Sequence, residues 1–111
     1  MMQLLVMVVD KEEDLDEIFE AFIDIGIKGV TVLDSYGSGH LFTENLSIFG
    51  KLSSIADGRK KHNKTIFSII EDPEKLEEAI EVVENIVGDL NQPHTAVLFT
   101  VPLGIVRGLT N

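Results

Sequence analysis

The order of its predicted strands and helices places this chain in the α+β class, as one antiparallel sheet covered by two helices. Four short apolar runs alternate with two amphipathic runs in the order β-α-β, long connection, β-α-β. Two such units joined in this way form the ferredoxin-like βαββαβ sandwich with a four-stranded antiparallel sheet. Right-handed crossovers put both helices on one face of that sheet. In this topology the first and third strands are central, and the second and fourth are edges.

Composition predicts a single globular domain over residues 1–111. The chain is 44% hydrophobic and contains no cysteine, which excludes disulfides, Cys-based zinc sites and a thiol nucleophile. No apolar run approaches the roughly 18 to 20 residues that span a bilayer. We therefore expect a cytoplasmic protein that does not insert into a membrane.

The first half of the chain predicts a strand, a helix and a second strand. Residues 3–9 are short, apolar and rich in β-branched side chains, which is typical of a buried strand. The apolar residues that follow recur at helical spacing and are Leu15, Ile18, Phe19, Phe22 and Ile23. We expect Asp10 to cap this helix, Glu13 to complete a capping box, and Gly26 to end the helix. Residues 29–35 form the second strand.

The second half repeats this pattern after a long connection. Residues 64–70 form the third predicted strand. The next helix has Asp72 as its cap, Pro73 at its first position and Gly88 at its end. Residues 95–101 form the fourth strand.

Both faces of the sheet are expected to be apolar at the first and fourth strands, whereas the second strand partly alternates. Residues 4–9 are all apolar, so neither face of the first strand is polar. The fourth strand has Val97, Phe99 and Val101 on one side, and Ala96 and Leu98 on the other. Because a chain of this length offers no third layer, we expect further copies of the chain to cover the second face. A few apolar side chains left in solvent are the alternative.

Scarce positive charge gathers at the end of the long connection, about residues 36–63, and just after it. The chain carries a formal charge of −10, yet Arg59, Lys60, Lys61 and Lys64 fall within six positions. One interpretation is a solvated loop that discourages edge pairing. The other is an anion site, in which Arg59 binds in a fork and the lysines add point charges.

The same sequence argues against several other functions. A pI near 4.5 opposes nucleic-acid binding. The three histidines, His40, His62 and His94, lack the spacing of a metal site. Because the sequence has no nucleophile with a base at a telling spacing, we expect no enzymatic activity.

Three stretches resemble the PII-like superfamily: "LDSYGSGH" at the end of the second strand, "VGDL…AVLFTVPL", and the trailing "IVRG". The resemblance implies a homotrimer that binds a nucleotide or another small molecule in clefts between subunits and signals through the long loop. The ligand residues implied here, together with the basic cluster, are Gly37, Gly39, His40, Asp89, Asn91, Gln92 and Arg107. The family's phosphate-binding Lys is missing from "NQPHTAVLF", which marks a divergent member.

The sequence therefore predicts a PII-like regulator that senses an anionic small molecule, either a carboxylate or a nucleotide such as an adenine nucleotide. Residues 40–63 would engage a protein target. Two alternatives stay open: a ligand-free trimer that binds a protein, and a protein similar to the copper-tolerance CutA family.

Overall fold

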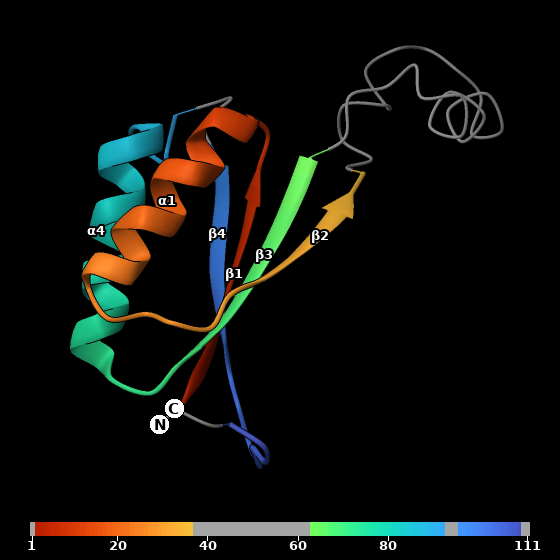
Figure 1. Cartoon of the computed structure of the whole chain (residues 1–111), viewed down its shortest axis with the longest axis vertical. Helices are drawn as coiled ribbons and strands as arrows, with labels where there is room; N and C mark the ends of the chain where they lie inside the picture. The colour runs from red at the N-terminus through yellow and green to blue at the C-terminus, as the bar shows by residue number, and fades with distance from the viewer. Residues whose placement is uncertain (1, 37–62, 93–95, 110–111) are drawn as a thin grey trace, which may run out of the picture.

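The computed structural model describes residues 2–36, 63–92 and 96–109. Its elements are β1 (Gln3–Val9), α1 (Glu12–Asp24), β2 (Thr31–Ser35), β3 (Asn63–Ile70), α4 (Pro73–Val87) and β4 (Ala96–Pro102). The strands form one sheet in the order β2-β3-β1-β4, and every neighbouring pair is antiparallel. Both helices lie on the same side of this sheet (Figure 1). The predicted ferredoxin-like sandwich is confirmed, including its central and edge strands.

The core lies between the sheet and the helices. Its buried apolar side chains come mainly from alternate positions of the two central strands and from the inner faces of the helices: Leu5, Met7, Val9, Ile66, Ile70, Ile18, Phe22, Ala79 and Val83. The alternation follows from the two-residue period of a strand, which sends successive side chains to opposite faces. The positions between them, such as Leu4, Val6 and Val8 of β1 and their partners across the ladders, point to the face away from the helices, here called the open face.

The start of α1 differs from the prediction. The helix begins at Glu12, and its N-cap is Lys11, whose side chain makes no capping hydrogen bond. The predicted Asp10 cap is wrong, because Asp10 lies one residue outside the cap position. The first turn carries Glu12, Glu13 and Asp14, whose negative charges favour the positive end of the helix dipole.

The other predicted helix ends are confirmed. Gly26 follows α1 with a φ of 93°, a conformation that side chains other than glycine rarely adopt. The Asp72 carboxylate accepts a hydrogen bond from the Glu74 amide at 2.9 Å, and Pro73 occupies the first position of α4. Gly88, with a φ of 97°, ends that helix.

Strand boundaries shift by one or two residues. β2 begins at Thr31 rather than at residue 29, because the chain before it diverges from β3. β3 begins one residue earlier than expected, at Asn63. β4 runs from Ala96 to Pro102, and a proline is tolerated at the end of an edge strand.

Candidate functional site

Five of the predicted ligand residues belong to the described part of the chain: Lys64, Asp89, Asn91, Gln92 and Arg107. The remaining candidates lie outside the described residues: Gly37, Gly39, His40, Arg59, Lys60 and Lys61. The 40–63 stretch, expected to engage a protein target, also lies outside them up to residue 62. Which of the six contribute to a site therefore stays a prediction.

The described candidates do not form one site within a single chain. Lys64 lies at the start of β3, beside the edge strand β2. The 89–92 turn follows α4 and precedes β4, which is the opposite edge of the sheet. Arg107 follows β4, at the other end of the sheet, where Leu103 donates a backbone hydrogen bond to Met2. A site that contains all of them needs more than one copy of the chain.

Several polar groups of the 89–92 turn form hydrogen bonds with one another. The Asp89 carboxylate accepts a hydrogen bond from the Asn91 amide at 2.9 Å. The Asp89 carbonyl accepts one from the Gln92 amide at 3.0 Å. An aspartate that bonds two residues ahead is typical of an Asx turn, so Asp89 has a structural role in the described turn.

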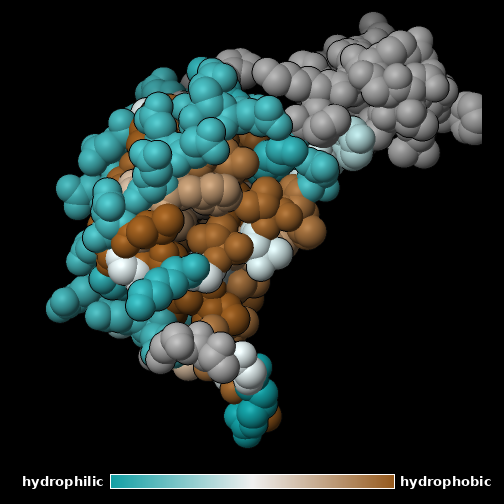
Figure 2. Space-filling model, in the orientation of Figure 1, coloured by the Kyte–Doolittle hydropathy of each residue, from teal (hydrophilic) through white to brown (hydrophobic). Residues whose placement is uncertain are grey.

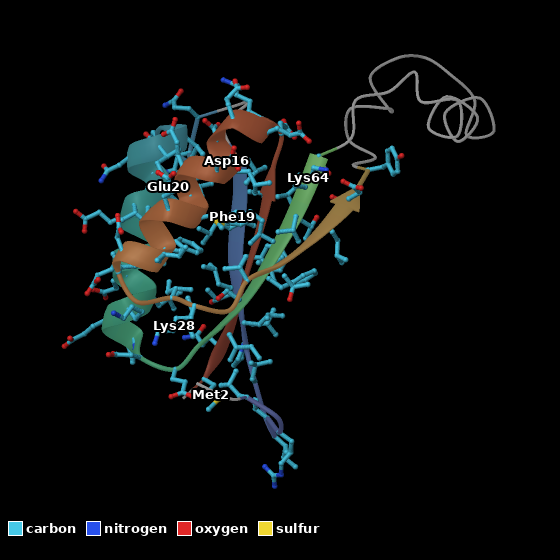
Figure 3. The ribbon with its side chains drawn as sticks, viewed as in Figure 1. Met2, Asp16, Phe19, Glu20, Lys28 and Lys64 are labelled. Carbon is cyan, nitrogen blue, oxygen red and sulfur yellow. The ribbon has the colours of Figure 1, made fainter. Side chains whose placement is uncertain are left out.

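Lys64, labelled at the start of β3 in Figure 3, is paired with two carboxylates from other elements. Its ammonium group donates a hydrogen bond to Asp34, its direct partner across the β2–β3 ladder. It also lies 3.5 Å from Glu12 Oε1, in the first turn of α1. The hydrogen bond to Asp34 is the main cause that raises the pKa of Lys64 above its ordinary value. An anionic ligand would have to compete with both carboxylates for this lysine.

A second polar cluster joins the same strands on the open face. The Ser35 hydroxyl donates to Asn63 Oδ1 at 2.6 Å, and it lies 2.7 Å from the Thr65 hydroxyl. Ser35 and Asn63 are direct ladder partners. The ends of β2 and β3 that flank residues 37–62 are thus tied together on both faces of the sheet.

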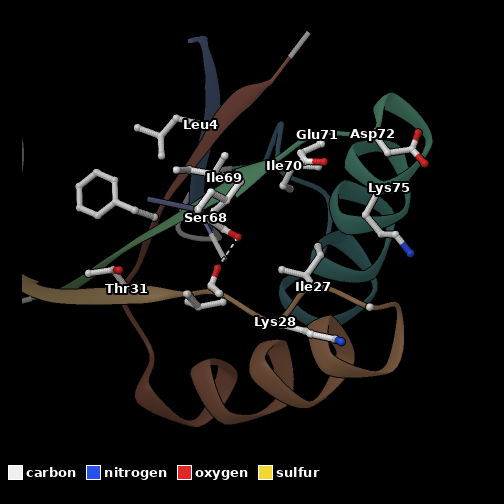
Figure 4. A pocket seen from close by; sticks show the side chains of 15 residues that line it. Leu4, Ile27, Lys28, Thr31, Ser68, Ile69, Ile70, Glu71, Asp72 and Lys75 are labelled. Carbon is white, nitrogen blue, oxygen red and sulfur yellow. Dashed lines mark hydrogen bonds between the residues drawn. The ribbon is translucent and has the colours of Figure 1, made fainter. Parts of the chain in front are cut away.

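The structure also contains a cleft that the sequence did not reveal. It has a volume of about 680 Å³ and lies between the 26–31 segment and the last part of β3 (Figure 4). The pairing between β2 and β3 ends at Thr31 and Phe67, so β3 continues for three residues past the ladder. The Ser68 hydroxyl, nearly completely buried, donates to the Gly29 carbonyl at 2.7 Å and spans this notch.

The cleft combines apolar walls with charges of both signs. Its apolar lining residues are Leu4, Ile27, Val30, Phe67, Ile69, Ile70 and Leu109. Lys28 and Lys75 contribute ammonium groups, and Glu71 and Asp72 contribute carboxylates (Figure 4). Lys75 already donates to the Ile25 carbonyl, and Asp72 caps α4. Lys28, which is exposed, is therefore the cation best placed to meet a ligand.

Sequence reasoning missed this cleft because its residues come from four separate segments. A visible signal was the "GIKG" stretch after the first helix, where two glycines flank a lysine. The ladder register, which ends β2 pairing at Phe67, was not visible.

The open face of the sheet is apolar over β1 and β4, as the sequence predicts. Leu4, Val6 and Val8 of β1 are aligned with Val101, Phe99 and Val97 of β4. In the described structure Val97 is 58% exposed and Phe99 is 48% exposed. Hydrophilic side chains cover the helices, whereas hydrophobic ones gather over the sheet (Figure 2). The predicted distribution of side chains is confirmed, and what covers the open face stays a prediction.

Among residues 2–36, 63–92 and 96–109, no three His, Cys, Asp or Glu side chains are arranged to hold a metal ion. The helices in this part of the chain are too short or too polar to cross a membrane.

Comparisons with known proteins extend the fold assignment and leave the function open. No protein-family model matches the chain, and no curated protein matches it. A solved structure, "the crystal structure of a functionally unknown protein from Pediococcus pentosaceus ATCC 25745", is similar with a TM-score of 0.62. It is 16% identical, and the match covers 97% of each chain. At this identity the likeness supports the ferredoxin-like fold alone, because one fold hosts many functions.

Proposed function

We propose that this protein is a non-enzymatic, PII-like homotrimer that binds an anionic small molecule between its subunits and signals through the 37–62 segment. The observation that carries the proposal is the apolar open face. A four-stranded sheet with helices on only one side leaves its other side to solvent unless another molecule covers it. Contiguous exposed apolar surface of this kind is typical of protein–protein interfaces.

Assembly through the open face would also complete the cleft. Leu4, Phe67 and Ile69 belong to both, since each lies on the open face and lines the cleft. A second copy seated on the open face would therefore flank the cleft and shield a bound ligand from water. Binding sites are commonly concave, mostly apolar and supplied with a few polar groups.

The positive charges near the cleft support an anionic ligand. Lys28 lines the cleft, and Arg107 belongs to the same tail as Leu109, which lines it too. The Arg107 guanidinium is exposed, and its one described hydrogen bond goes to the neighbouring Val106 carbonyl. On a chain with a charge of −10, local cations supply the attraction that an anion needs. A nucleotide or a small carboxylate fits this chemistry.

The proposal is tested in two steps on the full chain. Light scattering and sedimentation give the mass of the assembly, which we expect to be three times the 12.3 kDa of one chain. Thermal denaturation is then followed with ATP, ADP, citrate or inorganic phosphate, each matched to sodium chloride at equal ionic strength. We expect one of these anions to raise the melting temperature, and Lys28→Gln with Arg107→Gln to abolish the rise.

Each possible failure has its own meaning. A monomer at all concentrations would contradict the assembly, and with it the whole proposal. A trimer that none of the anions stabilises would contradict the sensing function and leave the alternative of a ligand-free trimer that binds a protein. Pull-downs of a partner that do not respond to these anions would support that alternative.

A further inference from the structure

Lys64 joins three elements that come from distant parts of the chain. It lies on β3, its cross-strand partner Asp34 lies on β2, and Glu12 is the first residue of α1. Asp34 and Lys64 also border the 37–62 segment. Residues 34–36 and 63–65 are here called the root of that segment. Through Lys64, the helical layer reaches this root.

Packing gives β2 little support from the helices. Four of its five residues are exposed, including Val32 on the helix side and Leu33 on the open face. In Figure 1, β2 diverges from α1 as it runs toward the root. An edge strand with few buried side chains is held mainly by its ladder and by polar contacts, and such regions open locally at low free-energy cost.

The two carboxylates interact with the Lys64 ammonium group with unequal strength. Asp34 accepts a hydrogen bond, whereas Glu12 lies 3.5 Å away with its side chain 79% exposed. The Lys64 side chain is only 22% exposed, so it is the fixed member of the group. Because exposed, longer ion pairs are the weaker ones, the Glu12 contact breaks first. The Ser35, Asn63 and Thr65 cluster on the other face keeps the two strands together when it does.

We propose that the Lys64–Glu12 contact is a latch that couples the first turn of α1 to the root of the 37–62 segment. With the latch closed, the root is held against the helical layer. With the latch open, β2 and the start of β3 move as one unit, independently of α1. This inference goes beyond the proposed function, since it requires neither a ligand nor an assembled trimer.

If this latch exists, a substitution in the first turn of α1 should change the rate of amide exchange in β2. Hydrogen–deuterium exchange of the full chain, read by mass spectrometry, compares Glu12→Gln with Glu13→Gln. The second substitution removes the same charge from the same turn, but from an exposed residue outside this ion-pair group. We expect Glu12→Gln to speed exchange in residues 31–35 and 63–65 by about two- to fivefold, the range for one exposed ion pair. Exchange in β1 stays unchanged, and Glu13→Gln leaves the root unchanged.

A double-mutant cycle with Lys64→Gln separates the latch from a general effect of charge. In a Lys64→Gln background, Glu12→Gln should have no further effect on the root. Both Gln variants are conservative, and thermal denaturation checks that each of them is folded. The inference is overturned if Glu12→Gln and Glu13→Gln act equally on residues 31–35, or if the Glu12 effect is confined to α1. It is also overturned if that effect persists without Lys64.

Discussion

Replacing Phe99 by serine tests the assembly face most directly. Phe99 lies near the middle of β4, directly across from Val6 of β1, and it remains 48% exposed in the single chain. A phenylalanine side chain buries about 150–250 Å² in full, so about 100 Å² is left for an interface to cover. At about 25 cal/mol per Å², burying this area contributes about 2.5 kcal/mol for each copy.

Serine recovers only a small part of that contribution. We therefore expect Phe99→Ser to weaken association by about 2 kcal/mol for each copy, which is about thirtyfold in the corresponding dissociation constant. Sedimentation velocity over a range of protein concentrations measures this shift. Ile23→Ser is the matched control, because Ile23 is an apolar side chain that is 69% exposed on α1, in the helical layer.

Phe99→Ser also removes packing within the chain, so a second variant keeps the test decisive. Val97→Thr replaces a 58% exposed side chain with one of nearly the same shape and strand preference. It should weaken association with little change in the stability of the chain. If folded Phe99→Ser and Val97→Thr proteins associate as tightly as the wild type, the open face is not the interface.

Two further predictions concern a hydrogen bond made by Ser68 and the ion pairs made by Lys64. Ser68→Ala removes the hydroxyl that donates to the Gly29 carbonyl across the notch. Urea denaturation should then show a loss of about 1 kcal/mol of unfolding free energy. An unchanged midpoint of urea denaturation would mean that this hydrogen bond does not stabilise the cleft wall. The pKa of Lys64 is raised above 10.5, mainly by its hydrogen bond to Asp34, so Lys64 adds stability that is complete below pH 10.5 and declines as the pH rises through the folded-state pKa. The melting-temperature difference between wild type and Lys64→Gln should therefore shrink above about pH 10.5, and a difference that is constant up to about pH 11.5 would contradict this reasoning.

Local patterns were sufficient for most of the fold. Apolar runs of strand length, helical spacing, and the Asp72, Pro73 and Gly88 signals of α4 predicted the elements in their observed order. The helix that lacked a side-chain cap, α1, was the one whose start was misplaced, since its acidic first turn offered several candidate cap positions. Boundaries of β2 and β4 shifted because the end of a strand depends on its partner across the ladder.

The candidate site was predictable only in part. The clustering of Arg59, Lys60, Lys61 and Lys64 is plain in the sequence, but nothing local indicates that Lys64 lies between Asp34 and Glu12. Those partners are 30 and 52 positions away, and only the ladder register and the placement of α1 bring them together. The cleft depends in the same way on the point where β2 leaves β3.

By itself, the sequence determined the class of fold and the apolar character of both sheet faces, because the period of a strand fixes which side chains share a face. Tertiary structure alone decided which charges meet. A salt bridge between distant segments requires a particular register and helix position, and these follow from packing of the whole chain rather than from any one stretch. Lys64, grouped by sequence with the anion-binding candidates, is in the folded chain a tie between α1, β2 and β3.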